Sequence, residues 1–150
     1  MDRWTTCYVA ATIWSHDTKK LKQVRTDVLP ITADYANQLQ LTPLPPLKAS
    51  PGYEIVRGEP RASVHLELGQ WDSKLRLGVW GCSAGAFRCE ESGDELQTLT
   101  MGRLRLVRED GSSEEFVAGD AIHTVKGEVL IWDVIEPVRK VFFTYNIDGV

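Results

Sequence analysis

From residue 60 onward, the chain is a series of short apolar runs that alternate with polar residues and are separated by Gly and Asp. Examples of these runs are SVHLEL, KLRLGVW, RLRLVRE and VRKVFFTYN. A period of two places successive side chains on opposite faces of a strand, and no helical period lies between the runs. Many short strands at this spacing are typical of an antiparallel sandwich or a small barrel. The sequence therefore predicts an all-β fold for this part of the chain.

Three dipeptides predict turns between these strands: Asp-Gly at 110–111, Gly-Asp at 119–120 and Lys-Gly at 126–127. Gly and Asp favour tight turns because they tolerate backbone conformations that other residues avoid. In the run 103–109, the two leucines share one face and the first two arginines share the other. This run is therefore predicted to be an antiparallel strand with one buried side.

The N-terminal third of the chain has a different character. The segment Trp4–Trp14 is rich in Thr, Tyr and Trp, which favours a strand. Residues 32–40 predict a short helix, with Thr32 as its N-cap. Residues 42–53 contain four of the seven prolines. Because proline interrupts both helices and central strands, this segment is predicted to be an extended connector over the surface.

Length and composition restrict the class of protein. A chain of 150 residues is long enough for one domain with a core and short for two. The net charge of −4, without a large basic stripe, argues against nucleic-acid binding. No apolar run approaches the roughly 20 residues that cross a bilayer, so no membrane partner is expected. Three cysteines without a CxxC pair and an N-terminus unlike a signal peptide favour a reducing compartment, and we expect the cytoplasm.

Two local motifs are more simply explained without chemistry. The stretch GCSAG at 81–85 matches the G-x-S-x-G nucleophile elbow, with Ser83 as the nucleophile. That motif requires a following helix, whereas the residues after it have no helical character, so a Gly-rich bend between strands is expected. The histidines His16, His65 and His123 are scattered, and none has the close spacing of a zinc motif.

An acidic cluster in the stretch CEESGDELQTLTMG, residues 89–102, is more informative. Glu90 and Asp94 are expected to be solvated, whereas Glu91 and Glu95 are expected to point into the barrel. Two inward carboxylates close together are not both stable in the ionised form unless a cation joins them.

The spacing around this cluster resembles the two motifs of the cupin superfamily. The glutamate and the final glycine of the first motif correspond to Glu95 and Gly102. The glycines of the second motif correspond to Gly119 and Gly127, with Val125 where proline is usual. The resemblance implies a cupin (RmlC-like) jelly-roll β-barrel, preceded by an N-terminal arm with a strand and a short helix.

Four longer stretches are similar to the small cupins of the ethanolamine-utilisation and ureidoglycine-aminohydrolase-like group (cupin_3, DUF861). They are GVWGCSAGAF, GDELQTLTMGRLRLVREDG, AGDAIHTVKGEVLIWDV and EPVRKVFF. The match divides the chain into an arm with a Pro-rich connector, residues 1–57, and a barrel, residues 58–150. Cupins of this size commonly pair, so the resemblance implies a homodimer, and the apolar segment Trp4–Trp14 suits strand exchange.

The chain departs from the metal-binding pattern of this superfamily. The positions of the first two histidines hold Cys89 and Glu91, and the third holds Leu130. Only Glu95 keeps its ligand type. Because a thiolate with two carboxylates and no imidazole is an unusual ligand set, we expect no metal cofactor.

The resemblance also implies a pocket inside the barrel. Lys140 is the basic residue typical of the family and a candidate partner of the inward glutamates. An ion pair of Lys140 with Glu95 or with Glu136 is equally well explained as a structural pair without chemistry. The pocket residues that we expect are Cys89, Glu91, Glu95, His123, Leu130, Trp132 and Lys140.

Three functions remain open from the sequence. The first is a metal-free barrel that binds a small molecule through carboxylates and a lysine. The second is an enzyme similar to the aminohydrolase or ethanolamine-utilisation relatives, with Glu95 or Glu91 as the general acid/base. The third is a structural or assembly module whose barrel is filled by its own side chains.

Overall fold

The computed structural model describes residues 28–147, and these residues are mostly strands. The segment Trp4–Trp14, for which a strand is predicted, lies outside the described residues. The elements in chain order are α1 (Ala33–Gln38), β1 (Thr42–Pro43), the 3-10 helix η1 (Leu47–Ala49), β2 (Tyr53–Arg57), β3 (Ala62–Leu68), β4 (Leu75–Cys82), β5 (Gly85–Glu90), β6 (Asp94–Arg108), β7 (Ser113–Val117), β8 (Ala121–Thr124) and β9 (Val129–Tyr145). Neither helix within 28–147 has the length and apolar character that a membrane crossing requires.

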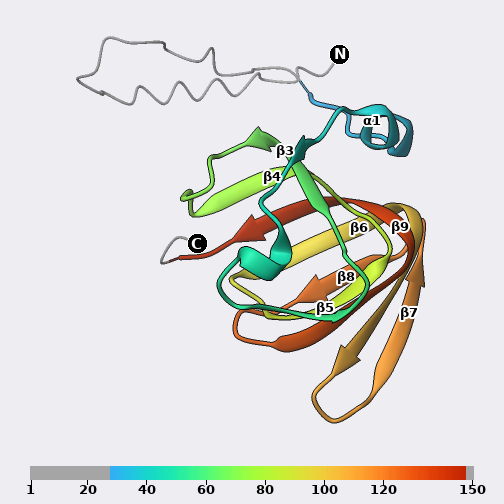
Figure 1. Ribbon diagram of the computed structural model, residues 1–150. Helices are drawn as coiled ribbons and strands as arrows, with labels where there is room; N and C mark the ends of the chain where they lie inside the picture. The colour runs from blue at the N-terminus through green and yellow to red at the C-terminus, as the bar shows by residue number, and fades with distance from the viewer. Residues whose placement is uncertain (1–27, 148–150) are drawn as a thin grey trace, which may run out of the picture.

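All strands pair antiparallel in one sheet that curls on itself (Figure 1). Along one path the order is β1-β3-β4-β9-β5-β2, while β6 pairs with β9, β7 and β8. Strand β9 holds the sheet together, because its first half pairs with β5, its second half pairs with β4, and β6 follows its length on the other edge. The prediction of an all-β jelly roll is confirmed.

A glycine allows β6 to follow this curvature. Gly102 has φ +84, in the region that favours glycine, and lies where the register between β6 and β9 shifts. A Cβ at this position would lie 2.1 Å from the carbonyl oxygen of Pro137. The backbones therefore approach so closely at this bulge that no larger residue fits without a shift.

The predicted hairpin turns are also confirmed. Residues 109–112 join β6 to β7, and the Asp110 carboxylate accepts a hydrogen bond from the Ser112 backbone N–H at 2.8 Å. In the next turn, Asp120 accepts from the backbone N–H of Val117 at the same distance. These side chains close the turns because short acidic residues can bond to the backbone two or three positions away.

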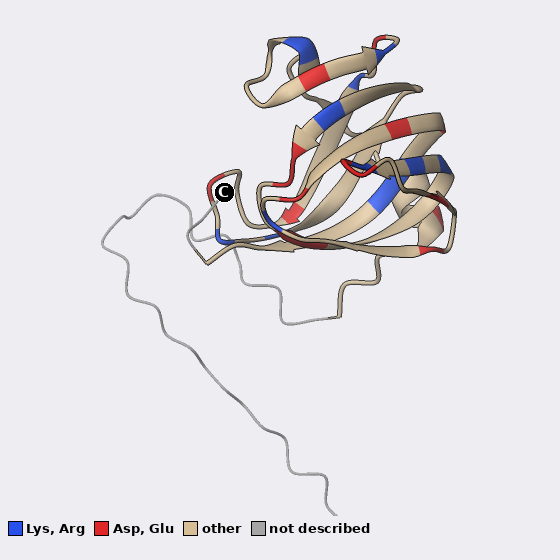
Figure 2. Ribbon diagram, turned by 90° about the horizontal axis from the view of Figure 1, so that it is seen from below, with Lys and Arg blue, Asp and Glu red and all other residues tan. Residues whose placement is uncertain are grey.

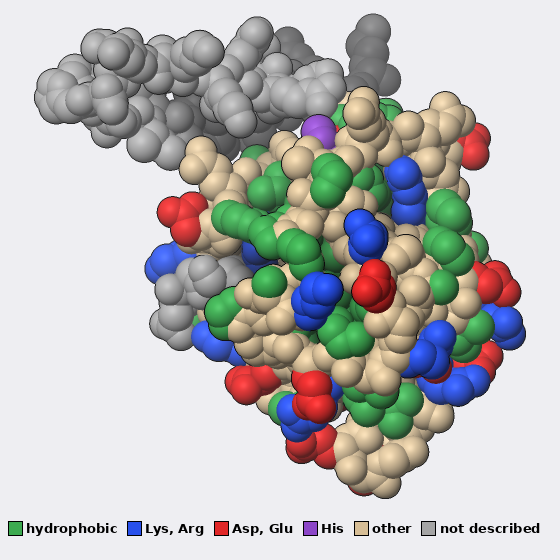
Figure 3. Space-filling model, in the orientation of Figure 1, with side chains coloured by type: hydrophobic (Ala, Val, Ile, Leu, Met, Phe, Trp, Pro, Cys, Tyr) green, Lys and Arg blue, Asp and Glu red, His purple; other side chains and the backbone are tan. Residues whose placement is uncertain are grey.

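The core lies inside the curl. Leu104 and Leu106 on β6 are buried with Val134 and Trp132 of β9, while the intervening Arg105 faces outward, as predicted. On the face in Figure 3, positive and negative side chains are interspersed among apolar and polar ones.

The N-terminal segment is more closely integrated than the sequence indicates. Thr32 caps α1 by accepting from the Tyr35 N–H, which confirms the predicted cap. Arg139 of β9 donates to the carbonyl oxygens of Ala36 and Leu39, both at 2.7 Å, and so attaches α1 to the sheet.

The Pro-rich connector is only partly extended. It contains η1, and its flanking residues form β1, which pairs with β3, and β2, which pairs with β5. The sheet therefore includes strands that precede the predicted boundary at residue 58. Proline does not prevent this pairing because β1 and β2 lie at the ends of the strand order, where unpaired N–H positions are tolerated.

Candidate functional site

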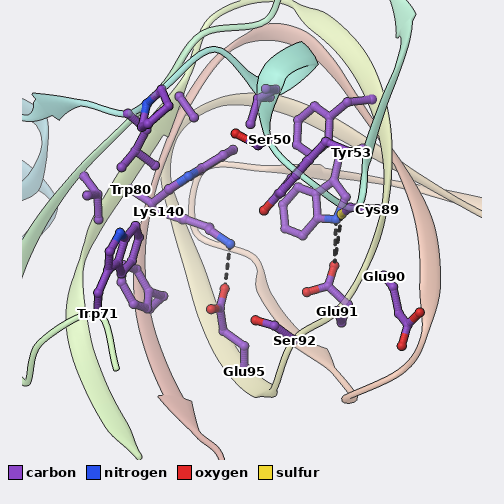
Figure 4. A pocket seen from close by; sticks show the side chains of 18 of the residues that line it. Ser50, Tyr53, Trp71, Trp80, Cys89, Glu90, Glu91, Ser92, Glu95 and Lys140 are labelled. Atoms are coloured by element: carbon purple, nitrogen blue, oxygen red, sulfur yellow. Dashed lines mark hydrogen bonds and ion pairs between the residues drawn. The ribbon is translucent and has the colours of Figure 1, made fainter. Parts of the chain in front are cut away.

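A half-open cavity of about 320 Å³ lies inside the curled sheet. Its wall includes six aromatic side chains, Tyr53, Trp71, Trp80, Phe87, Trp132 and Phe142. Charged groups from β6, β9 and the segment after β5 point into the same space (Figure 4). Arg76 from β4 also lines it. An aromatic wall with a few convergent polar groups is typical of a site for a small ligand.

An ion pair occupies the centre of the cavity. Lys140 of β9 donates from Nζ to Glu95 Oε1 and to Gln97 Oε1, both at 2.6 Å. The second carboxylate oxygen of Glu95 accepts from the Thr144 hydroxyl at 2.6 Å. The side chains of Lys140 and Glu95 are only 8% and 16% exposed. Of the two candidate partners of Lys140, the structure therefore has Glu95, whereas Glu136 pairs with Arg103 on the surface.

The second inward glutamate has a different environment. Glu91 follows β5, in a loop that is held by backbone hydrogen bonds between Glu91 and residues 127–128. Its Oε1 accepts from the indole N–H of Trp132 at 2.8 Å. Burial raises the pKa of Glu91, and the charge of Lys140 and the bond from Trp132 only partly oppose this effect.

The pKa of Glu95 shifts in the opposite direction to that of Glu91. Burial by itself would raise its pKa, but the charge of Lys140 and the hydrogen bonds from Lys140 and Thr144 lower the pKa below its ordinary value. Two carboxyl groups in one cavity therefore have pKa values that their surroundings move apart. Glu95 is held as a carboxylate, while Glu91 is biased toward the neutral acid.

Cys89 and Tyr53 add two neutral polar groups. Burial, together with the charge of Glu91, raises the pKa of the Cys89 thiol to about 12. Burial is the main cause that raises the pKa of Tyr53 to about 12 as well. The thiol is therefore protonated at neutral pH, and its Sγ lies 4.0 Å from Glu91 Oε1.

The aromatic wall and the lysine form one packed unit. Lys140 Nζ lies 4.4 Å from the ring centroid of Trp132 and 4.9 Å from that of Trp80. Trp132 stacks on Phe87 with centroids 6.3 Å apart. The indole faces stabilise the ammonium, so Lys140 is fixed from several directions.

Five of the seven expected pocket residues line this cavity: Cys89, Glu91, Glu95, Trp132 and Lys140. Glu90 and Asp94 are exposed, as predicted. Residues 91–93 separate β5 from β6, so Cys89, Glu91 and Glu95 do not lie on one strand and converge through the turn between two strands.

The expectation that His123 and Leu130 line the same cavity is wrong. On β8, Ile122 and Thr124 point inward, so the period of two places His123 on the exposed face. Leu130 is buried in the core, and both residues border a separate hollow beside β7.

The expected bend at 81–85 joins β4 to β5, and its Ser83 hydroxyl accepts from the Arg61 backbone N–H.

Several site residues have no counterpart in the sequence prediction. Arg76 and Trp80 lie on β4 in alternating positions, and the strand pattern of KLRLGVW was a signal that they share a face. Tyr53 belongs to β2, directly after the Pro-rich segment, and no local signal connects it to a residue 36 positions away. Its pairing with Cys89 brings it to the cavity.

The donor set does not suit the divalent metal that many cupins hold. Among residues 28–147, no group of three or more His, Cys, Asp or Glu side chains is arranged to hold a metal ion. The Lys140 ammonium lies 2.6 Å from Glu95, the one residue that keeps its ligand type, and would repel a cation there. The Cys89 thiol, with its raised pKa, is a poor ligand because metals bind the thiolate.

The curled antiparallel sheet with a cavity between its strands is consistent with a cupin jelly roll, the class that the sequence motifs indicate. The model of the EutQ-like cupin domain matches residues 70–142. Over these residues the chain therefore contains a cupin domain of the EutQ-like (DUF861) type.

Solved structures agree with this fold. The EutQ protein of Clostridium difficile is 20% identical with a TM-score of 0.52, and the alignment covers 59% of this chain and 71% of that chain. A putative ethanolamine utilization protein Q from Salmonella typhimurium is 20% identical with a TM-score of 0.50, covering 57% and 69%. A DUF861-family protein of unknown function from Pseudomonas syringae is 26% identical with a TM-score of 0.59, covering 71% of this chain and 45% of that chain. No curated protein matches the chain.

Proposed function

We propose that the barrel cavity binds a small polar organic molecule and does so without a metal ion. The observation that carries this proposal is the half-open cavity of about 320 Å³, with an aromatic wall and buried charged groups from several strands. Its size falls at the lower end of the range of ligand pockets, about 300–1,000 Å³. An open cavity of this kind weighs against a barrel that is simply filled.

Lys140 supports the metal-free part of the proposal. In a metal-binding cupin a cation neutralises the inward glutamate, and here the Lys140 ammonium supplies a positive charge at 2.6 Å from Glu95. The other polar groups are a thiol and a glutamate biased toward its neutral form. Such groups donate hydrogen bonds to a ligand more readily than they coordinate a divalent ion.

Blocking the mouth of the cavity tests the proposal. Ser50 lines the cavity directly after η1, and its hydroxyl donates to the Pro46 carbonyl oxygen at 3.2 Å. The Ser50→Trp variant should fill the mouth, whereas Ser112→Trp, in the exposed turn between β6 and β7, is the matched control. Ligand-observed NMR with small acids, amides and amines should show binding to the wild type and to Ser112→Trp, and loss of binding in Ser50→Trp.

Two results would contradict the proposal. Binding of no panel member to the wild type, or equal binding to Ser50→Trp, removes the cavity as the site. Stoichiometric manganese, iron or zinc in protein purified without chelator and retained through dialysis contradicts the metal-free part.

A second candidate function is acid/base catalysis by Glu91. It is favoured by the separation of the two pKa values, since a carboxyl group with a raised pKa can exchange a proton near neutral pH while Glu95 stays ionised. Time-resolved NMR on each molecule that binds should then show conversion by the wild type and none by Glu91→Gln. Binding without conversion leaves the ligand-binding function and rejects catalysis.

A further inference from the structure

Arg76 lies in the cavity without an ionic partner. It is on β4, lines the cavity, and is only 8% exposed. Its Nε is buried without a hydrogen-bond partner, and within residues 28–147 no carboxylate forms an ion pair with its guanidinium. Its guanidinium lies over the Trp71 ring, whose centroid is 5.0 Å from Cζ.

A buried guanidinium in this position requires a hydrogen-bond acceptor. It carries five N–H donors, stays protonated in proteins and prefers planar oxygen pairs. Arg103 on β6 shows how a guanidinium is usually neutralised. Its Nε is also without a partner, but its terminal nitrogens pair with the carboxylates of Glu136 and Glu115. Arg76 has the same donors in a more buried place and no such carboxylates.

The glutamates of the cavity do not serve as carboxylate partners of Arg76. Both oxygens of Glu95 are engaged, one by Lys140 and one by Thr144. Glu91 bonds to Trp132, and burial raises its pKa toward the neutral form. Once Lys140 and Glu95 neutralise each other, the charge of Arg76 remains uncompensated in the cavity. Burial lowers the pKa of Arg76, and the charge of Glu95 only partly opposes this effect.

We infer that Arg76 binds the carboxylate of the cavity's ligand, and that this ligand is a small monocarboxylic acid. The inference rests on the proposed function, because it names the chemical class of the molecule that the cavity takes. A carboxylate matches the guanidinium fork with two parallel hydrogen bonds and supplies the single negative charge that is missing. The apolar body of the acid lies along the aromatic wall of the cavity.

The topology also orients the ligand. Strands β4 and β5 pair with different halves of β9: Arg76 is opposite Thr144, and Glu90, the residue before Glu91, is opposite Val129. Lys140 of the central Lys140–Glu95 pair lies between these two positions along β9. In Figure 4, Trp71, on which Arg76 stacks, and Glu91 lie at opposite sides of that pair. A ligand that spans the cavity therefore has its carboxylate at Arg76, and its other end faces Glu91 and the Tyr53 hydroxyl.

Acids and their matched amides test the inference. The pairs benzoate and benzamide, and phenylacetate and phenylacetamide, differ in charge and hardly in shape. Titration of the full chain at pH 7.5, followed by NMR, should show that each acid binds about tenfold or more tightly than its amide, since hydrogen bonds to charged groups are the stronger class. The Arg76→Gln variant should lose this preference, and Arg103→Gln should keep it.

Other outcomes separate the inference from the proposed function. Amides that bind the wild type as tightly as acids overturn the carboxylate but leave a ligand-binding cavity. A preference for acids that persists in Arg76→Gln overturns the role of Arg76. Inorganic phosphate that binds through Arg76 while the acids do not replaces the carboxylate with another anion, and binding of no compound at all removes the proposed function itself. If Arg76→Gln does not fold, Arg76→Lys replaces it: with a point charge and no fork it should weaken the preference, and an unchanged preference contradicts fork recognition.

Discussion

Strands β6 and β9 take part in two groups of ion pairs, one on the outer surface and one inside the cavity. On the surface, Arg105 lies 2.5 Å from Glu115, with side chains 40% and 43% exposed. In the cavity, Lys140 lies 2.6 Å from Glu95, with side chains 8% and 16% exposed. Figure 2 shows acidic and basic residues on neighbouring strands. The distances are nearly equal, so distance by itself does not tell the two groups apart.

The difference lies in the solvent. Water and salt screen the surface pairs, and loss of one partner leaves the other hydrated. A charge in the cavity that loses its partner stays in a medium that solvates it poorly. Surface pairs can therefore be numerous with little effect on the stability of the fold. Each charge in the cavity, in contrast, needs a defined partner, either from the chain or from a ligand.

The largest expected effect comes from breaking the cavity pair. Glu95→Gln leaves the Lys140 ammonium without its carboxylate, and urea unfolding should show a loss of about 3 kcal/mol in the free energy of unfolding. Glu115→Gln, the matched change on the surface pair, should not shift the unfolding midpoint measurably. Equal effects of the two substitutions would contradict the contrast between the two groups.

A smaller effect of opposite sign is expected at Arg76. Arg76→Met removes a buried charge that has no partner and keeps apolar length against Trp71. Because the half-open cavity admits some water to the guanidinium, the ligand-free variant should be more stable than the wild type by about 1 kcal/mol. Saturating benzoate should then stabilise the wild type and not the variant. A ligand-free variant that is less stable means that Arg76 already has a stabilising role in the empty cavity.

The smallest effect concerns Glu91 and depends on pH. Because its pKa is raised in the folded state, the folded chain binds more protons at this site than the unfolded chain above the ordinary glutamate range. The contribution of Glu91 to stability is therefore present at low pH and lost as the pH rises through the folded pKa. Glu91→Gln should match the wild type near pH 4 and be more stable at neutral pH, as measured by urea unfolding across the range.

Glu95 provides the control of opposite sign. Its pKa is lowered in the folded state, so its contribution is present above the ordinary glutamate range and is lost as the pH falls through the folded pKa. Identical pH profiles for wild type and Glu91→Gln would mean that Glu91 is ionised as easily in the cavity as in the unfolded chain.

Much of the fold could be predicted because its causes are local. The alternation in β6, the Thr32 cap and the glycine turns each depend on residues a few positions apart. Family motifs extended this to Lys140 as a candidate partner of the inward glutamates, but they did not decide between Glu95 and Glu136.

The rest of the site could not be predicted because it depends on pairing between distant strands. Tyr53 reaches the cavity only through the pairing of β2 with β5, and the exposed position of His123 depends on which residues of β8 turn inward. A slip of one residue in the register would reverse every such assignment.

The sequence by itself determined that the chain is a β protein of the cupin type, where its turns lie, and that the usual histidine ligands are replaced by Cys89, Glu91 and Leu130. Only the tertiary structure decided the partner of each charge: Lys140 with Glu95, Glu91 with Trp132, and Arg76 with no carboxylate of the described chain. The physical reason is that alternation determines which face a side chain shares, whereas burial and partners arise only when strands from β2 to β9 close around one space.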